Sequence, residues 1–372
     1  MPTPVYIISD NVISPLGNTS QENYERIVNG ETGISQVNDL SLSPIPFYAS
    51  KINDDKLPVL DGPFTRFEML CILSAKEALA QTSVKLSDRD TIFILSTTKG
   101  NIELITGGDN DISLSKTAES IGSYFHAVNK PVVVSNACIS GVLAIITAKR
   151  LLASGKYKHA VVTGADVLSK FVVSGFQSLM AISDEPCRPF DKDRKGINLG
   201  EGTATVVMTT DKALTDNTSI LVMGEGLTND ANHISGPSRT GQELSDAVTK
   251  AMNRSGVKNS DLSFVSAHGT ATLYNDEMES KAFDAAGLRD VPLHSLKGYF
   301  GHTLGAAGVI ETIMSIYSLR NKAILASRNF EQLGVPSYLN ITTAVAGSDK
   351  KVALKTASGF GGCNVALLYS TV

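Results

Sequence analysis

The sequence has few of the residues that build metal sites and disulfides. Only four cysteines occur in 372 residues, and their separation matches no metal-ligand spacing: Cys71, Cys138, Cys187 and Cys363. We therefore expect reduced thiols, no bound metal and a cytoplasmic location.

Long apolar runs and strong charge of either sign are also missing. The formal net charge of −4 gives no overall attraction to nucleic acid or to an anionic membrane surface. Residues 131–152 form the most apolar window, but polar residues and a basic pair divide it. A strand followed by a buried helix explains this window better than a membrane span. The first residues run directly into an apolar strand, so no signal peptide is expected.

The length and the repeated rhythm of the chain indicate a duplicated core. A chain of 372 residues exceeds the usual size of a single core. Residues 132–150 and 293–320 share one pattern: a strand, a polar tip, small residues and a long buried helix. Two further pairs of segments correspond in the same order: 6–17 with 221–232, and 91–100 with 262–272. We predict an α/β fold of two duplicated βαβαβ halves, residues 1–209 and 210–372, with two central buried helices.

Cys138 lies where the first of these strands turns into its helix. Three valines precede the turn, and an apolar run from Val142 onward indicates a core helix. The N-terminus of a helix favours an anion, so we expect the pKa of the Cys138 thiol to be lowered. Gly141, one turn into the helix, allows backbone or substrate to approach the sulfur. Taken alone, an inert buried cysteine explains this position equally well.

Two of the six histidines follow strands of the second half. His268 comes after the strand 262–266, and His302 follows the short strand 292–296, each with small residues on both sides. In open α/β sheets, functional sites form at the carboxyl ends of strands. Two histidines at such ends, together with Cys138, favour a catalytic site.

These side chains suit chemistry on thioesters. A cysteine sulfur exchanges readily with a thioester. Two neutral imidazoles that each offer an N–H would hold a thioester carbonyl and stabilise an enolate as a carboxylate leaves as carbon dioxide. The resulting carbanion would attack the acyl group on the cysteine. Lys297, five residues before His302, would tune or hold that histidine, and Glu311 is a possible partner of Lys297.

Five motifs in this order resemble the β-ketoacyl-[acyl-carrier-protein] synthases, condensing enzymes of the thiolase superfamily. They are Asn136-Ala-Cys-Ile-Ser-Gly141, Cys187-Arg-Pro-Phe-Asp191 with its following glycine turn, His268-Gly-Thr-Ala-Thr272, Lys297-Gly-Tyr-Phe-Gly-His302 and Ser358-Gly-Phe-Gly-Gly-Cys-Asn364. The resemblance covers essentially the whole chain. It implies a ketosynthase of the elongating type II kind, with the thiolase-like αβαβα layered fold and decarboxylative Claisen condensation as its reaction.

The resemblance also implies roles for individual residues. Cys138 would accept the acyl group, and His268 and His302 would form the decarboxylation pair. The remaining expected site residues are the supporting Lys297 and Glu311, the gate Phe360 with its neighbour Gly361, the phosphopantetheine-binding Thr270 and Thr272, and Phe176 near the entrance.

No resident cofactor is expected, because phosphopantetheine would arrive on the partner, an acyl carrier protein. The substrates would be malonyl and acyl thioesters. The family implies a dimer, either a homodimer or a ketosynthase heterodimer.

Three departures from the family pattern stand out. The segment between Gly100 and Cys138 is short for an elongating enzyme, and a leucine follows Thr272 where a proline is usual. The segment 176–180 lacks the arginine often used for carrier docking, which leaves Arg66 and Lys76 as candidate contacts.

Two alternatives remain open. A thiolase acting on coenzyme A thioesters needs a second cysteine as base, and Cys363 is the candidate. A chain-length-factor-like subunit would pair with an active synthase, but such partners usually lack the nucleophile that this chain has at Cys138.

Overall fold

The computed structural model describes residues 3–107, 112–232 and 234–372, and its core is built from two halves with the same strand order. The first half has the order β5–β4–β6–β8–β1, and the second has β11–β10–β14–β15–β9. In both halves the first three strands in that order are parallel and the last two join antiparallel. The duplication that the sequence predicts is therefore present in the sheet topology.

The strands of the two halves have the following bounds. In the first half they are β1 (Tyr6–Ile13), β4 (Thr91–Ser96), β5 (Val132–Val134), β6 (His159–Asp166) and β8 (Gly202–Thr209). In the second half they are β9 (Ile220–Asn229), β10 (Leu262–Ser266), β11 (Leu293–His294), β14 (Val352–Gly359) and β15 (Cys363–Thr371). The halves meet where β1 pairs antiparallel with β9, so that hydrogen bonds run through one ten-stranded sheet.

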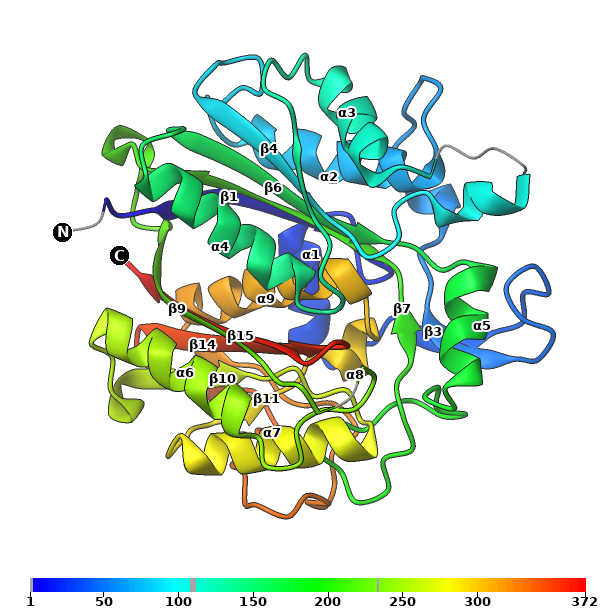
Figure 1. The fold of residues 1–372 in the computed structure, drawn as a ribbon, viewed down its shortest axis with the longest axis vertical. Coiled ribbons are helices and arrows are strands. Elements are labelled where there is room, and N and C mark those ends of the chain that lie inside the picture. Colours follow the sequence, from blue (N-terminus) through cyan, green and yellow to red (C-terminus); the bar gives the residue numbers. More distant parts are fainter. Residues whose placement is uncertain (1–2, 108–111, 233) are drawn as a thin grey trace.

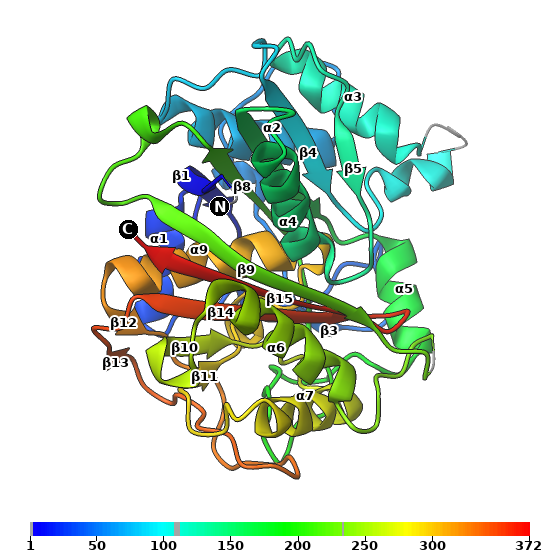
Figure 2. The same cartoon turned by 60° about the vertical axis from the view of Figure 1, so that its left-hand side comes forward.

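Helices cover the outer faces of the sheet halves and fill the space between them (Figure 1). The first half contains α1 (Ser20–Val28), α2 (Arg66–Ala80), α3 (Leu114–Tyr124), α4 (Ser140–Ala153) and α5 (Lys170–Ser178). The second contains α6 (Gln242–Ser255), α7 (Leu273–Ala285), α8 (Lys297–Phe300) and α9 (Ala307–Arg320). Helices α2 and α3 lie outside the first half of the sheet, and α6 and α7 lie outside the second half. Helices α4 and α9 lie between the two sheet halves. The layers are therefore αβαβα, as expected (Figure 2).

The two central helices are apolar on nearly every side because both are enclosed. Their side chains share one cluster with strands from both halves, including Val142 and Ile145 of α4 and Val309 and Ile313 of α9. A helix enclosed in this way has no polar face to present to water. None of the described helices is both long enough and apolar enough to cross a membrane.

The connecting segments differ from the sequence expectation in two places. Residues 34–64 show little pattern, yet β2 (Ile34–Val37) and β3 (Phe47–Ser50) form a hairpin that pairs with β7 (Leu199–Gly200). The strand expected at 292–296 extends only over β11, because the chain turns into α8 at Lys297. The other short elements are β12 (Ala323–Ile324), β13 (Ala346–Gly347) and the 3₁₀ turns 54–56, 102–107, 212–214, 259–261 and 304–306.

Candidate active site

Cys138 sits in the turn between β5 and α4, at the base of a cavity of about 460 Å³. The preceding residue, Ala137, has φ +44°, a left-handed conformation that a side chain adopts at a cost. This strained turn places the cysteine at the start of α4, where the sequence pattern predicts it. The residue is only 9% exposed, and it lines the cavity.

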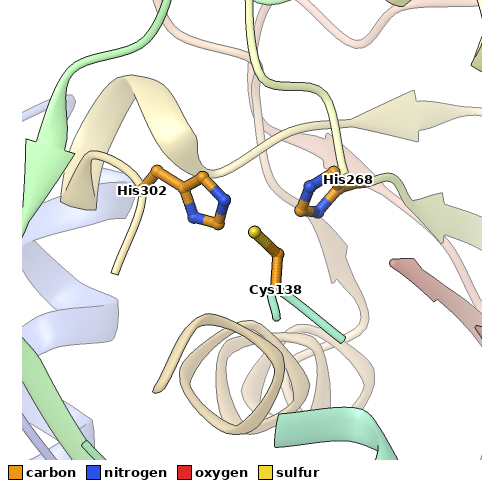
Figure 3. A group of neighbouring side chains, drawn as sticks. All are labelled: Cys138, His268 and His302. Carbon is orange, nitrogen blue, oxygen red and sulfur yellow. The ribbon is translucent and has the colours of Figure 1, made fainter. Parts of the chain in front are cut away.

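The two predicted histidines face this sulfur. Cys138 Sγ points into the space between the rings of His268 and His302 (Figure 3). One nitrogen of each ring and the sulfur all lie within 4.8 Å of one another, and the two ring centroids are 5.2 Å apart in an edge-to-face arrangement. The histidines lie 130 and 164 positions after Cys138 in the sequence, and they meet it because each residue follows the carboxyl end of a strand.

The hydrogen bonds at the back of each ring set its tautomer. The backbone N–H of Leu304 donates to His302 Nδ1 at 3.3 Å, and Lys297 Nζ lies 3.4 Å from His268 Nδ1. A backbone amide and an ammonium only donate, so Nδ1 of each ring accepts and the ring proton is on Nε2. Both imidazoles therefore offer an N–H donor. A histidine that binds a metal ion does so through a nitrogen with a free electron pair. Because Nε2 of both rings carries a proton, this arrangement disfavours metal binding.

Burial decides the protonation of the three reactive groups. Desolvation, helped by the positive charge of Lys297, holds the pKa of both His268 and His302 well below the usual value, so both rings are neutral at pH 7. For Cys138 the prediction from the helix N-terminus is wrong in direction. Burial raises the pKa of its thiol to about 11, because the loss of water outweighs the attraction of Lys297.

His302 is fixed through its backbone by the segment after the Arg-Pro-Phe-Asp motif. Its N–H donates to the Asn198 carbonyl at 2.7 Å, and its carbonyl accepts the Gly200 N–H at 3.0 Å. A side chain at Gly200 would collide with the Phe300 carbonyl. The glycine is needed here because two backbones approach each other closely.

Behind His268 lies a buried group of charges. Lys297 Nζ contacts Glu311 Oε1 at 2.8 Å, and this pair is the one that the sequence suggested. A second lysine, Lys355 on β14, reaches Glu311 Oε2 at 2.6 Å. Lys355 is not among the residues predicted from the sequence, although a lysine inside an apolar strand is a usable signal. Lysine is almost never fully buried without a partner.

Two carboxylates of α7 hold the loop that carries His268. Glu279 accepts the backbone N–H groups of His268 (2.8 Å) and Gly269 (2.6 Å), and Asp276 accepts that of Thr270 (3.0 Å). Both carboxylates are buried, and burial together with Asp276 raises the pKa of Glu279 to about 7. Neither residue was identified from the sequence, because contacts with backbone N–H groups leave no side-chain pattern.

The predicted substrate-binding residues lie mostly along the cavity. Thr270 and Thr272 line it and are hydrogen-bonded to each other at 2.8 Å. Phe176 of α5 and Phe360 of the β14–β15 turn also line it, with stacked rings 6.1 Å apart. Gly361 does not line this cavity, and its backbone N–H donates to the Ile234 carbonyl.

Three other candidates are placed away from the reactive sulfur. Cys363 directs its Sγ to the side-chain oxygens of Asn136 and Asn229, each at 3.1 Å, and does not line the cavity. Arg66 is held by buried Glu201 and by Asp54, and Lys76 lies on a different surface of α2.

Comparison with known proteins gives matches along the whole chain. The family models named β-ketoacyl synthase, N-terminal domain and C-terminal domain match residues 3–213 and 220–331. The 3-oxoacyl-[acyl-carrier-protein] synthase 2 of Mycobacterium leprae is 31% identical over 268 residues, which cover 68% of this chain and 63% of that protein. The chain thus spans less than two thirds of that relative in the match. The synthase 2 of Vibrio cholerae is 27% identical over 416 residues, covering 98% of both proteins.

Solved structures support the same fold. A ketosynthase from Xenorhabdus doucetiae, solved in complex with its chain length factor, has a TM-score of 0.86 at 24% identity and covers 100% of this chain and 98% of its own. A β-ketoacyl synthase from Burkholderia phymatum has a TM-score of 0.87 at 23% identity, with both chains fully covered. The matched domains, the relatives and the shared fold agree: this chain belongs to the β-ketoacyl synthase family.

Proposed function

We propose that the protein is a β-ketoacyl-[acyl-carrier-protein] synthase that condenses an acyl group on Cys138 with malonyl-carrier protein. The observation that carries this proposal is the convergence of one thiol and two neutral imidazoles in a single cavity. Both imidazoles carry their proton on Nε2, which suits them to hold a carbonyl oxygen rather than to accept a proton.

The first half-reaction is transfer of the acyl group to Cys138. The S–C bond to Cys138 forms as the S–C bond to the carrier's phosphopantetheine breaks. The departing thiol takes up a proton where Cys138 gives one up, so no net charge is left in the buried site. The backbone N–H of Cys138, against which Gly359 packs, is the proposed donor to the oxyanion.

The second half-reaction is decarboxylation followed by condensation. The Nε2–H groups of His268 and His302 donate to the malonyl thioester carbonyl. The bond to the carboxylate breaks, carbon dioxide leaves, and the electron pair passes into the enolate that these donors stabilise. The carbanion attacks the acyl carbonyl on Cys138, a carbon–carbon bond forms, and the C–S bond breaks to return the cysteine thiolate. The thiolate takes one proton from solvent water, which completes the balance.

The partners follow from this chemistry. An acyl carrier protein would deliver phosphopantetheine into the cavity past Phe360 and along Thr270 and Thr272. A second subunit, identical or a related ketosynthase chain, is expected to complete the molecule. Structural relatives support both kinds of partner, since they include a ketosynthase in complex with its chain length factor and a ketosynthase in complex with an acyl carrier protein.

The two alternatives find less support. The thiolase reaction needs a second thiol at the nucleophile, and the Cys363 thiol is bound to two asparagines outside the cavity. A non-catalytic partner subunit does not need a nucleophile, whereas this chain has Cys138 together with His268 and His302. Turnover of malonyl-carrier protein without an added second protein would distinguish the proposed enzyme from both.

Acylation is tested by incubating the protein with acyl-carrier protein and measuring its intact mass. We expect one acyl adduct, absent in Cys138→Ala and retained in the matched control Cys363→Ala. No adduct on the wild-type protein, or an adduct that persists in Cys138→Ala, would contradict the first half-reaction.

Condensation is tested by adding malonyl-carrier protein and measuring carbon dioxide and β-ketoacyl product. His302→Ala should still be acylated but lose condensation by on the order of a hundredfold or more, because one enolate donor is removed. His126→Ala, at an exposed position, is the control and should behave as the wild type. Undiminished product from His302→Ala would overturn the role of His302.

A further inference from the structure

Lys355 is a lysine without any exposed surface, placed in the middle of strand β14. Its ammonium meets three acceptors, namely Glu311 Oε2 at 2.6 Å and the carbonyls of Ser266 (3.2 Å) and Ala267 (3.1 Å). A charged lysine ammonium has three N–H groups, and each of them has an acceptor here. A neutral amine has only two N–H groups, so one of the three acceptors would receive no hydrogen bond. Burial lowers the pKa of Lys355 and Glu311 opposes that change, so the three acceptors favour a charged lysine in the core.

Lys297 is satisfied in the same way. It contacts Glu311 Oε1 at 2.8 Å, the His268 carbonyl at 2.7 Å and His268 Nδ1 at 3.4 Å. Glu311 is the carboxylate that both lysines share, and they hold its pKa below the usual value despite its burial. One carboxylate between two ammonium groups leaves a net charge of one positive unit behind the His268 ring.

The two lysines also fix the backbone that leads into His268. Lys355 binds the carbonyls of residues 266 and 267, and Lys297 binds that of residue 268. On the other side of this loop, Glu279 accepts the N–H groups of residues 268 and 269. The two lysines thus bind the carbonyl groups of the His268 loop, and Glu279 binds its N–H groups. A small displacement of a lysine ammonium or of the Glu279 carboxylate would therefore move the imidazole ring.

We propose that Lys355 is a positioning residue for decarboxylation: it holds the His268 loop and supplies the second positive charge that keeps the His268 ring neutral with its proton on Nε2. This inference rests on the proposed function and adds to it a residue that none of the five motifs contains. The positive charges of Lys297 and Lys355 lower the pKa of His268, in addition to burial. The other titratable groups around the pair are Glu311, His302, Glu279 and His294.

The test compares Lys355→Met with Thr356→Val in the full chain. Thr356 is the next residue on β14 and is equally buried, but its replacement changes no charge. In Lys355→Met, acylation of Cys138 should stay within about twofold of the wild type, and malonyl-carrier protein decarboxylation should fall by on the order of a hundredfold at pH 7. The acid limb of its pH profile should move to higher pH, because protonation of His268 becomes easier.

A second variant separates charge from packing. Glu311→Gln combined with Lys355→Met again leaves one uncompensated positive charge, so the acid limb should return toward its wild-type position even though a second buried group has changed. If the double variant is shifted further than Lys355→Met, the charge argument is wrong. If Lys355→Met loses acylation and decarboxylation equally while remaining folded, its role is structural and the proposal fails.

A measurement without turnover keeps this inference distinct from the proposed function. The ¹⁵N shifts of the His268 ring, assigned by comparison with His268→Gln, report its tautomer and its titration. The wild type should show a neutral ring with the proton on Nε2 at pH 7, and Lys355→Met should titrate at higher pH. Identical titrations in both proteins would overturn the positioning role. Absent decarboxylation by the wild type would instead count against the proposed function.

Discussion

At the scale of single residues, burial favours the neutral thiol of Cys138 over a preformed thiolate. The turn and the helix N-terminus place the sulfur as expected, but burial raises its pKa to about 11. A thiolate is the reactive form of cysteine, so the site depends on the substrate to bring acylation about. An uncharged thiol also suits a cavity whose surface is mostly apolar.

This protonation state predicts the pH dependence of alkylation. Because the pKa lies near 11, the thiolate fraction grows as pH rises, and the rate of iodoacetamide alkylation of Cys138 should increase by about tenfold per pH unit between about pH 7 and about pH 10. Intact mass after timed quenching gives the rate, and Cys138→Ala gives the background from other thiols. A rate that levels off below about pH 8 would show that the helix N-terminus outweighs burial.

The lowered pKa values of the two histidines lead to a second prediction, which concerns the rate of decarboxylation at acid pH. Burial and Lys297 lower the pKa of His268 and His302, so each becomes protonated only well below the usual pH for histidine. Decarboxylation of malonyl-carrier protein should therefore keep its rate as pH falls through about 6.5, the ordinary pKa of histidine. Initial rates across the acid range check this, with carrier-protein integrity monitored in parallel. A half-maximal rate at the ordinary pKa would mean that the rings are not desolvated during turnover.

At the scale of elements, the crossing of α4 and α9 sets the position of Cys138. A Cβ on Gly141 would lie 2.8 Å from the backbone nitrogen of Val309, and a Cβ on Gly308 would collide with Val142. The two glycines let the helices touch backbone to backbone. Ala137 and Leu304 each lie four residues before one of these glycines, and both have φ near +50°, at +44° and +50°. The turn that presents the nucleophile is thus repeated in the second half.

This crossing predicts that Gly141→Ala destabilises the protein although alanine is the better helix former. Overpacking at a closed contact costs about 1–3 kcal/mol, which exceeds the gain of about 1 kcal/mol from helix propensity. Urea unfolding followed by circular dichroism measures the change.

Gly175→Ala in α5 is the matched control, because a Cβ there meets nothing within 4 Å. It should be neutral or stabilising by up to about 1 kcal/mol. Equal effects of the two substitutions would show that the helices are free to move apart at the crossing.

At the scale of the whole molecule, the two halves share one core. Val142 and Ile145 of the first half pack in the same cluster as Val309 and Ile313 of the second, and β1 pairs with β9. Without the second half, the inner face of α4 would be exposed to water. The repeated topology is therefore a duplication within one continuous sheet and a shared apolar cluster, and the boundary after residue 209 stays a prediction about sequence organisation.

This shared core predicts that residues 1–209 do not fold alone. The fragment should show no cooperative thermal transition by circular dichroism and no dispersed amide signals by NMR, because exposure of a large apolar face removes much of its stabilisation. The full chain is expected to unfold in a single transition detected equally by fluorescence and circular dichroism. A fragment that melts cooperatively would show that the halves are independent domains.

Features that depend on neighbouring residues could be predicted from the amino-acid sequence. Strand runs, the turn before Cys138, the histidines after β10 and α8, and the order of the duplicated segments are written in local patterns, because periodicity and small residues decide local backbone structure. The order of motifs also gave the family, and the family models confirm it.

The tertiary structure alone decided what depends on distant groups. Lys355 of β14 and Glu279 of α7 bind backbone atoms of residues 266–268 from distant parts of the sequence, and no local pattern encodes these contacts. The pKa of Cys138 was predicted in the wrong direction for the same reason. Desolvation is set by everything that packs around a group, and the chain segments that bury this sulfur come from both halves of the molecule.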